Sequence, residues 1–390
     1  MDNRRPIFDD VERNDASPAA HGETSFAFLN RVAGTYWEHP RQLLQSWADR
    51  LPDDAYADVV GRLRKDDEQA QSAFLEVYLH ESLLRAGYSV TVHPDLPNAR
   101  RHVDFLAVRD SERFYIEAVM PRNSPAHGEA NRLARFLDGI NKLDDDRFWL
   151  DLQETHVGAR AIKSADVRRQ LKRWLNTLDP DAISPRDDRA QFLWSEGDWS
   201  ARFGAVPKPR SRRESSRGRA IAVYSHLPAE VVDDAGVIRR GALSKAQGYG
   251  ALDAPFVIAV GVYLFDRDLE DAIAAMYGHT AWQIPVSGDP SEGVRMNDGF
   301  FGTHGSPRYR GTSAVLVVNQ LQPWHVHMAQ VTLFHHPWTQ EPLVTSPFHA
   351  TEMRLEGSEL VRSLPTMSSE EYFGVESWAH AAAWPRDESS

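Results

Sequence analysis

Cysteine is absent from the 390 residues of this sequence. Without a thiol, the chain can form no disulfide bond, no thiolate zinc site and no cysteine nucleophile. Any metal ion that the protein binds must therefore be held by oxygen atoms or by imidazole nitrogens.

Long apolar runs are also missing. No stretch approaches the roughly 20 consecutive apolar residues of a membrane-spanning helix. The first 24 residues are polar and acidic, and they lack the apolar core of a signal peptide. We therefore expect a cytoplasmic protein that makes no contact with a membrane.

Positive charge is scarce relative to negative charge. The 44 lysine and arginine residues face 56 aspartate and glutamate residues, which gives a net charge of −12. This balance argues against a protein that coats nucleic acid non-specifically, because that affinity comes largely from basic side chains on phosphates. A local basic groove is still compatible with it, since six of the twelve residues in 208–219 are basic. This segment is either a solvated loop or part of such a groove.

The apolar pattern predicts an α/β fold with a mixed sheet. A helix over 72–86, apolar on nearly all sides, ends at Gly87, which suits the left-handed conformation that follows many helices. Segments rich in β-branched and aromatic residues come next, and a later helix leads into a continuous apolar strand of the buried parallel kind. Strands are expected at 88–93, 102–108, 114–119, 148–152, 220–224, 255–263, 313–318 and 330–334, and further helices at 129–143, 166–178, 237–249 and 269–276.

These elements suggest a central core that is interrupted and extended. We expect a disordered tail over 1–24, an N-terminal helical cap over 25–70, a core formed by 71–122 and 236–265, a large inserted region over 123–235, and a C-terminal extension over 266–390. The core then has the order helix, three strands, helix and strand.

Two acidic residues stand opposite each other in the expected sheet. If the second and third strands form a hairpin that turns at Asp110 and Ser111, residues whose numbers add to 221 face each other, as Asp104 and Glu117 do. Opposed side chains have Cβ atoms about 4.5–5.5 Å apart, and like charges there are destabilising. A divalent cation offsets this repulsion, and carboxylate oxygens suit Mg²⁺ or Mn²⁺. The pattern therefore predicts a metal site, with two ordinary acids on an exposed sheet face as the alternative.

A third acid, Glu76, lies on an apolar stripe of the first core helix with Leu79 and Leu83. A carboxylate buried there is costly without a partner, which indicates a metal-binding or hydrogen-bonding role. Glu81 is a similar candidate that can instead form a structural ion pair.

The segment from Phe74 to Val119, FLEVYLHESLLRAGYSVTVHPDLPNARRHVDFLAVRDSERFYIEAV, resembles the PD-(D/E)XK superfamily of restriction-endonuclease-like enzymes. A helix bearing an acid is followed by Gly and an aromatic residue, then by a strand, a strand near an aspartate, and a strand bearing Glu. The chain is similar to a bacterial branch with E-x-V in place of E-x-K. The resemblance implies a restriction-endonuclease-like core in which Asp104 and Glu117 bind Mg²⁺ or Mn²⁺ and Glu76 assists.

The motif lysine of that superfamily is replaced here by Val119. In several branches the lysine lies instead on the following core helix. Lys245 is the leading candidate for this role, with Tyr249 expected at i, i+4 on the same helix face. Lys142 is the second candidate, and an exposed, uninvolved Lys245 is the alternative.

The resemblance implies a metal-dependent nuclease, a hydrolase that acts as an endonuclease on DNA rather than RNA, in bacterial defence or DNA processing. A homodimer or a larger defence complex is the expected assembly. The alternatives are a catalytically inactive member of the fold that binds nucleic acid or a protein, and a structural subunit of a larger complex.

A histidine-rich stretch near the C-terminus is a weaker signal. His325 and His327 have the spacing of one strand face, and Trp324 and Trp338 lie nearby in the sequence. We expect a packed aromatic rim there in preference to a zinc site, because the sequence shows no third converging ligand.

Overall fold

The computed structural model divides the chain into two compact units by its contacts. The first unit comprises Met1–Pro18, Thr24–Arg122 and Asp233–Ser390, and the second comprises Ala19–Glu23 and Asn123–Val232. The main segment of the second unit falls within the region that the sequence marks as an insertion. The structure describes residues 4–20, 22–96, 102–121, 132–133, 136–137, 139–158, 160, 162–183, 190–210, 220–224, 233–249, 252–264, 269–283 and 292–383.

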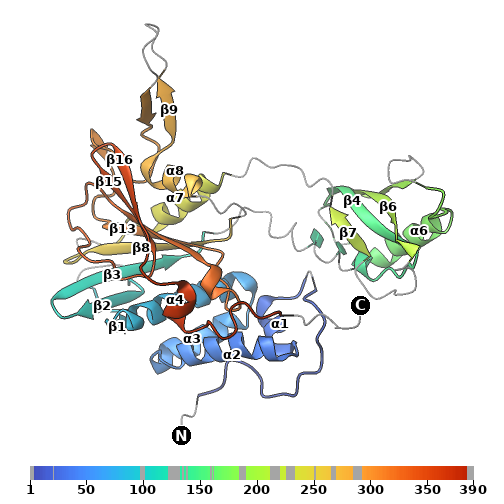
Figure 1. The fold of residues 1–390 in the computed structure, drawn as a ribbon, viewed down its shortest axis with the longest axis horizontal. Coiled ribbons are helices and arrows are strands. Elements are labelled where there is room, and N and C mark those ends of the chain that lie inside the picture. Colours follow the sequence, from blue (N-terminus) through green and yellow to red (C-terminus); the bar gives the residue numbers. More distant parts are fainter. Residues whose placement is uncertain are drawn as a thin grey trace. The chain divides into compact units, whose positions relative to one another are not determined.

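A large mixed sheet organises the first unit (Figure 1). Within the described residues it has eight strands in the order β1-β2-β3-β8-β13-β14-β15-β16, with both parallel and antiparallel pairs, so the predicted α/β fold is confirmed. The strands are β1 Ser89–Val92, β2 Phe105–Arg109, β3 Glu112–Val119, β8 Phe256–Val262, β13 Ala314–Asn319, β14 Gln330–His335, β15 Thr351–Glu356 and β16 Glu359–Ser363.

Strand β8 lies inside this sheet and is buried along its whole length. It pairs in parallel with β3 on one side and with β13 on the other. A strand in this position is covered by helices on both faces, which is why its sequence is a continuous apolar run. The predicted parallel strand is therefore confirmed.

Helices pack on both faces of the large sheet (Figure 1). On one side lie α1 Ser25–Arg31, α2 Thr35–Ala48, α3 Asp53–Leu63 and α4 Asp67–Arg85, and on the other lie α7 Asp234–Lys245 and α8 Glu270–Tyr277. The side chain of Asp66 caps α4 by accepting a hydrogen bond from the backbone N–H of Gln69. The chain leaves that helix through Gly87, whose φ of 84° is the left-handed conformation expected from the sequence.

Two boundaries differ from the sequence-based expectation. The N-terminal segment, expected to be a disordered tail, is packed: Ile7 is fully buried, and its N–H donates to Gln45 at 2.9 Å. A single apolar pair such as Ile7 and Phe8 carries no periodic signal, so the sequence does not predict this contact. The expected C-terminal extension supplies β13 to β16 and thereby half of the large sheet's strands among the described residues.

The second unit contains a four-stranded sheet, within the described residues, in the order β5-β6-β4-β7. Its elements are β4 Phe148–His156, α6 Ser164–Leu175, β5 Gln191–Glu196, β6 Trp199–Pro207 and β7 Ile221–Tyr224. The sequence-based expectation does not include β5 and β6. The buried Trp194 and Trp199 stand among polar residues, so the pattern there does not indicate a strand. Part of the helix expected at 129–143 lies outside the described residues.

Short elements complete the described part of the chain. They are β9 Thr280–Gln283 paired with β10 Glu292–Arg295, β11 Gly302–Thr303 paired with β12 Ser306–Pro307, the 3₁₀ helix η3 Val326–Met328 and the helix α9 Ser369–Phe373. Among the helices that the structure describes, none has the length and apolar character needed to cross a bilayer.

Close packing between α7 and the sheet gives a first prediction. A Cβ atom added at Gly241 would lie 2.7 Å from Cγ of Pro121 and 2.9 Å from Cγ1 of Val260. We expect Gly241→Ala to lower the free energy of unfolding by about 1–3 kcal/mol through overpacking. Gly61→Ala in α3 is the matched control, because nothing lies within 4 Å of its added Cβ. Chemical denaturation should show this control to be about 0.5–1 kcal/mol more stable than the wild type, and equal effects of both substitutions would contradict the packing.

Candidate metal-binding active site

The hairpin of β2 and β3 has the register expected from the sequence. Phe105 lies opposite Ile116, and Arg109 lies opposite Glu112, so paired residue numbers add to 221. Asp104 is the residue immediately before β2, and this register places it across from Glu117. The predicted register of the hairpin is therefore confirmed, and its extension by one residue sets the two acids opposite each other.

Asp104 is fixed next to the strand that carries Glu117. Its Oδ2 accepts a hydrogen bond of 2.6 Å from the backbone N–H of Ala118, the neighbour of Glu117. Its Oδ1 lies 4.0 Å from Nε2 of His93. The carboxylate thus lies at the start of β2, an inner strand of the sheet, with one backbone N–H at hydrogen-bond distance.

Glu117 is buried, with only 3% of its surface exposed. Its Oε1 accepts a hydrogen bond from Nζ of Lys245 at 2.5 Å. Its Oε2 is buried and has no hydrogen-bond partner within the part of the chain that the structure describes. A buried carboxylate oxygen left without a donor is costly, so this atom indicates a place for a further cationic partner.

The predicted link to the later helix is therefore present in the geometry. Lys245 is the last residue of α7 and reaches Glu117 across 128 positions of sequence. Tyr249 does not share that helix, because α7 ends at Lys245 and Gly248 adopts a φ of 110°. Tyr249 packs against Phe256 instead. Lys142, the second candidate, belongs to the second unit.

Glu76 has a partner that the sequence did not reveal. The carboxylate of Glu76, in α4, accepts hydrogen bonds from both terminal nitrogens of Arg62 in α3. Nη1 lies 2.7 Å from Oε1, and Nη2 contacts Oε2. Two parallel bonds of this kind are among the strongest ion pairs in proteins. Arg62 and Glu76 lie on different helices, so no periodic pattern in the sequence predicts their contact. Glu81 is likewise paired structurally, with Arg50 and Arg85.

The three acids influence one another. Burial, the negative charge of Glu117 and then that of Glu76 raise the pKa of Asp104 to about 7, against the opposing effects of the Ala118 hydrogen bond and of Lys245. A carboxylate in this setting resists ionisation near neutral pH unless a cation joins it. The site is therefore electrostatically strained when it holds no additional positive charge.

The donor set fits a hard divalent cation. Asp104 and Glu117 offer carboxylate oxygens from opposed positions, and Oε2 of Glu117 has no other described partner. Mg²⁺ commonly takes one or two carboxylates and completes its shell with water and phosphate oxygens. Both oxygens of Glu76 already accept hydrogen bonds from Arg62, so a cation bound by Glu76 would have to use the lone pairs that remain.

Histidines near the site have different environments. Burial lowers the pKa of His80 to about 4, so this side chain is neutral and belongs to the core beside Phe105. His93 faces Asp104 at the distance given above and is largely exposed. His102 is also exposed. Of these three histidines, only His80 is part of the core.

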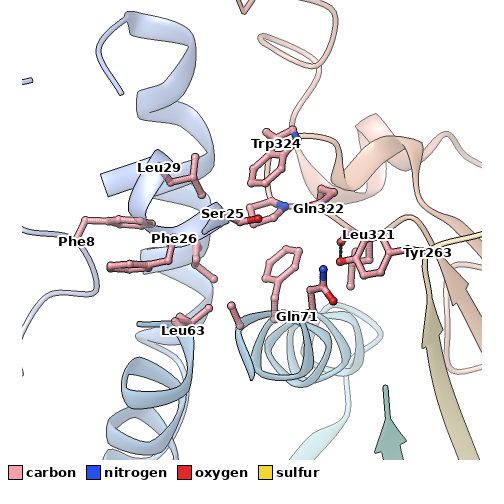
Figure 2. Close-up of a pocket in the computed structure, with 14 residues that line it drawn as sticks. Phe8, Ser25, Phe26, Leu29, Leu63, Gln71, Tyr263, Leu321, Gln322 and Trp324 are labelled. Atoms are coloured by element: carbon pink, nitrogen blue, oxygen red, sulfur yellow. Dashed lines mark hydrogen bonds between the residues drawn. The ribbon is translucent and has the colours of Figure 1, made fainter. Parts of the chain in front are cut away.

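An apolar pocket lies elsewhere in the first unit, between the helical cap and the end of β8 (Figure 2). Figure 2 shows Phe26, Leu29 and Trp324 around it, and Tyr263 donating to the carbonyl of Leu321. Its volume of about 30 Å³ has room for one or two water molecules and no larger ligand. It contains none of the acidic residues, so we assign it to packing.

The basic segment is only partly described. Residues 211–219 lie outside the described part of the chain. Lys208 is buried and donates to the carbonyl of Asp145 at 2.8 Å, and Arg210 pairs with Asp181. Lys208 thus serves the core of the second unit and belongs to neither a solvated loop nor a basic groove.

The raised pKa of Asp104 makes a stability prediction. The folded carboxyl binds its proton more tightly than the unfolded one, whose pKa is 3.8, so this group's contribution to stability is fully present below pH 3.8 and is lost as pH rises to about 7. In metal-free buffer at pH 8, we expect the free energy of unfolding of Asp104→Asn to be about 1–3 kcal/mol higher than that of the wild type. The gain should shrink at pH 5 in urea titrations with EDTA, and a gain that is the same at both pH values would contradict the assignment.

Comparison with known proteins finds no match to this chain. Neither protein-family models, nor curated proteins, nor solved structures match it. The function therefore has to follow from the geometry and chemistry of the site.

Proposed function

We propose that the protein is a Mg²⁺- or Mn²⁺-dependent nuclease that hydrolyses phosphodiester bonds of DNA. The observation that carries the proposal is the contact between Lys245 and Glu117, at 2.5 Å. Val119 leaves the third strand without a lysine, and α7 supplies an ammonium group to the same acid pair. Opposed carboxylates can hold a cation for metal-assisted phosphodiester hydrolysis, and a lysine beside such a pair is a feature of the superfamily that the sequence resembles.

Each residue has a definable task in this proposal. Asp104 and Glu117 would hold the cation, which lowers the pKa of a bound water and offsets charge on the phosphate. Asp104 must lose its proton to bind, which favours activity above about pH 7. Lys245, 28% exposed, is anchored by Glu117 and remains accessible to a phosphate oxygen or an attacking water. Glu76 lies close enough to add negative charge, with Arg62 holding it in place.

The order of elements supports a restriction-endonuclease-like core. Helix α4, strands β1 to β3, helix α7 and strand β8 follow in sequence, and the four strands are adjacent in the sheet. We therefore extend the proposal to membership of the PD-(D/E)XK superfamily. DNA as the partner, a homodimer or a larger defence complex as the assembly, and a role in bacterial defence or DNA processing belong to the same proposal and rest on that resemblance.

A second candidate function is favoured by the ion pairs themselves. Arg62 neutralises Glu76 and Lys245 neutralises Glu117, so two of the three acids are paired without any metal. A catalytically inactive protein that keeps the fold and binds nucleic acid or a protein partner would retain such pairs for stability. In that case, the wild type and Asp104→Asn would bind DNA equally well.

Cleavage assays separate the two candidates. We expect the wild type with Mn²⁺ to cleave DNA, and Asp104→Asn and Lys245→Met each to lose about 100-fold or more of the rate, because each removes charge stabilisation from the transition state. Arg240→Met is the matched control on α7: Arg240 pairs with Asp233 and is 63% exposed. It should keep wild-type activity at saturating DNA.

The substrates should include single- and double-stranded DNA and RNA, with EDTA as the metal-free control. Equal residual cleavage by the wild type and Asp104→Asn would overturn the nuclease assignment. Absence of cleavage together with unchanged DNA binding by Asp104→Asn would favour the inactive binding protein.

A further inference from the structure

A second group of metal-binding side chains lies outside the carboxylate site. His327, Glu370 and His380 each offer one ligand atom, and these atoms lie within 4.8 Å of one another. The three residues come from η3, from α9 and from the segment that follows α9. No sequence pattern predicts this convergence, because Glu370 and His380 are far from His327 along the chain.

The side chains of this His327–Glu370–His380 cluster converge on one point. Nε2 of His380 lies 3.5 Å from Oε1 of Glu370, and the rings of His327 and His380 have centroids 5.6 Å apart. Ligand atoms around a single Zn²⁺ lie about 3.3 Å apart, given bonds of about 2.0 Å in a tetrahedron. His380, with 78% of its side chain exposed, can rotate to close the remaining gap.

His327 provides an independent sign of a missing ligand. It is only 9% exposed, and its Nδ1 is buried without a hydrogen-bond partner among the described residues. An unpaired buried ring nitrogen costs about 1–3 kcal/mol, so its burial is unfavourable in the absence of a partner. Coordination of a metal through Nδ1 would remove that cost.

The elements that carry the cluster are firmly anchored. Trp378, two residues before His380, is buried, and its ring stacks on that of His39 at 5.5 Å. Phe373, at the end of α9, packs against Trp47 and Tyr78. Ligands held by a packed scaffold lose little freedom when a metal binds, which favours affinity.

We propose that His327, Glu370 and His380 bind one Zn²⁺ ion. Two imidazoles and a carboxylate form a ligand set typical of zinc, whereas Mg²⁺ prefers oxygen ligands alone. Three protein ligands leave a coordination position for water or for another small donor. The ion would fasten the segment after α9 to η3, at a site whose chemistry differs from that of Asp104 and Glu117. This inference does not depend on the proposed nuclease activity.

Zinc titration of the full chain tests the site. The protein must carry no histidine tag and must be stripped with EDTA before it competes with a chromophoric chelator for Zn²⁺. We expect one tightly bound equivalent, a higher melting temperature with Zn²⁺, and at least about 100-fold weaker binding in Glu370→Gln and in His380→Ala, because loss of a ligand exceeds the 10–100-fold effect of losing its supporting contacts. Excess Mg²⁺ should not displace the ion.

Two controls make the result specific. His304→Ala changes an exposed histidine that is not part of the cluster, and Asp104→Asn alters the carboxylate site. Both should bind zinc like the wild type. Absence of stoichiometric binding by the wild type, or unchanged affinity in both Glu370→Gln and His380→Ala, would overturn the proposal.

Discussion

The ion pair between Lys245 and Glu117 joins a helix and a strand separated by 128 positions of sequence. Glu117 is buried among apolar residues of the sheet, so removal of Lys245 would leave a buried carboxylate without its cation. The contact exists because α7 leads into β8, which lies parallel to β3, and because Gly241 lets the helix approach the sheet closely. The crossover connection thus determines where the lysine meets the acids.

Charge balance around this pair explains the character of the site. Arg62 satisfies Glu76 and Lys245 satisfies one oxygen of Glu117, whereas Asp104 has only a backbone N–H at hydrogen-bond distance among its described contacts. Burial, together with the negative charges of Glu117 and Glu76, therefore raises the pKa of Asp104. A divalent cation between Asp104 and Glu117 would relieve it. The proposed zinc cluster near the C-terminus follows a different rule, since imidazoles select a softer ion than carboxylates do.

Local patterns predicted much of the core. Alternation along β2 and β3, with a two-residue turn, was sufficient to place Asp104 opposite Glu117. The apolar run of β8 identified a buried parallel strand. Contacts between distant segments left no such signal: Arg62 with Glu76, and His327 with Glu370 and His380, depend on how separate elements pack. The end of α7 was also misplaced, because Gly248 breaks the helical pattern before Tyr249.

Metal binding to the acid pair is the central claim, and direct measurement of bound Mn²⁺ tests it without relying on catalysis. Electron paramagnetic resonance can count free and bound Mn²⁺ at pH 8 in the wild type and in the Asp104→Asn, Glu117→Gln double variant, with Glu370→Gln present in both to disable the proposed zinc cluster. The account predicts that the wild-type acid pair binds Mn²⁺ and that the double variant loses this binding by about 100-fold or more. Equal binding of Mn²⁺ by the two proteins would contradict it.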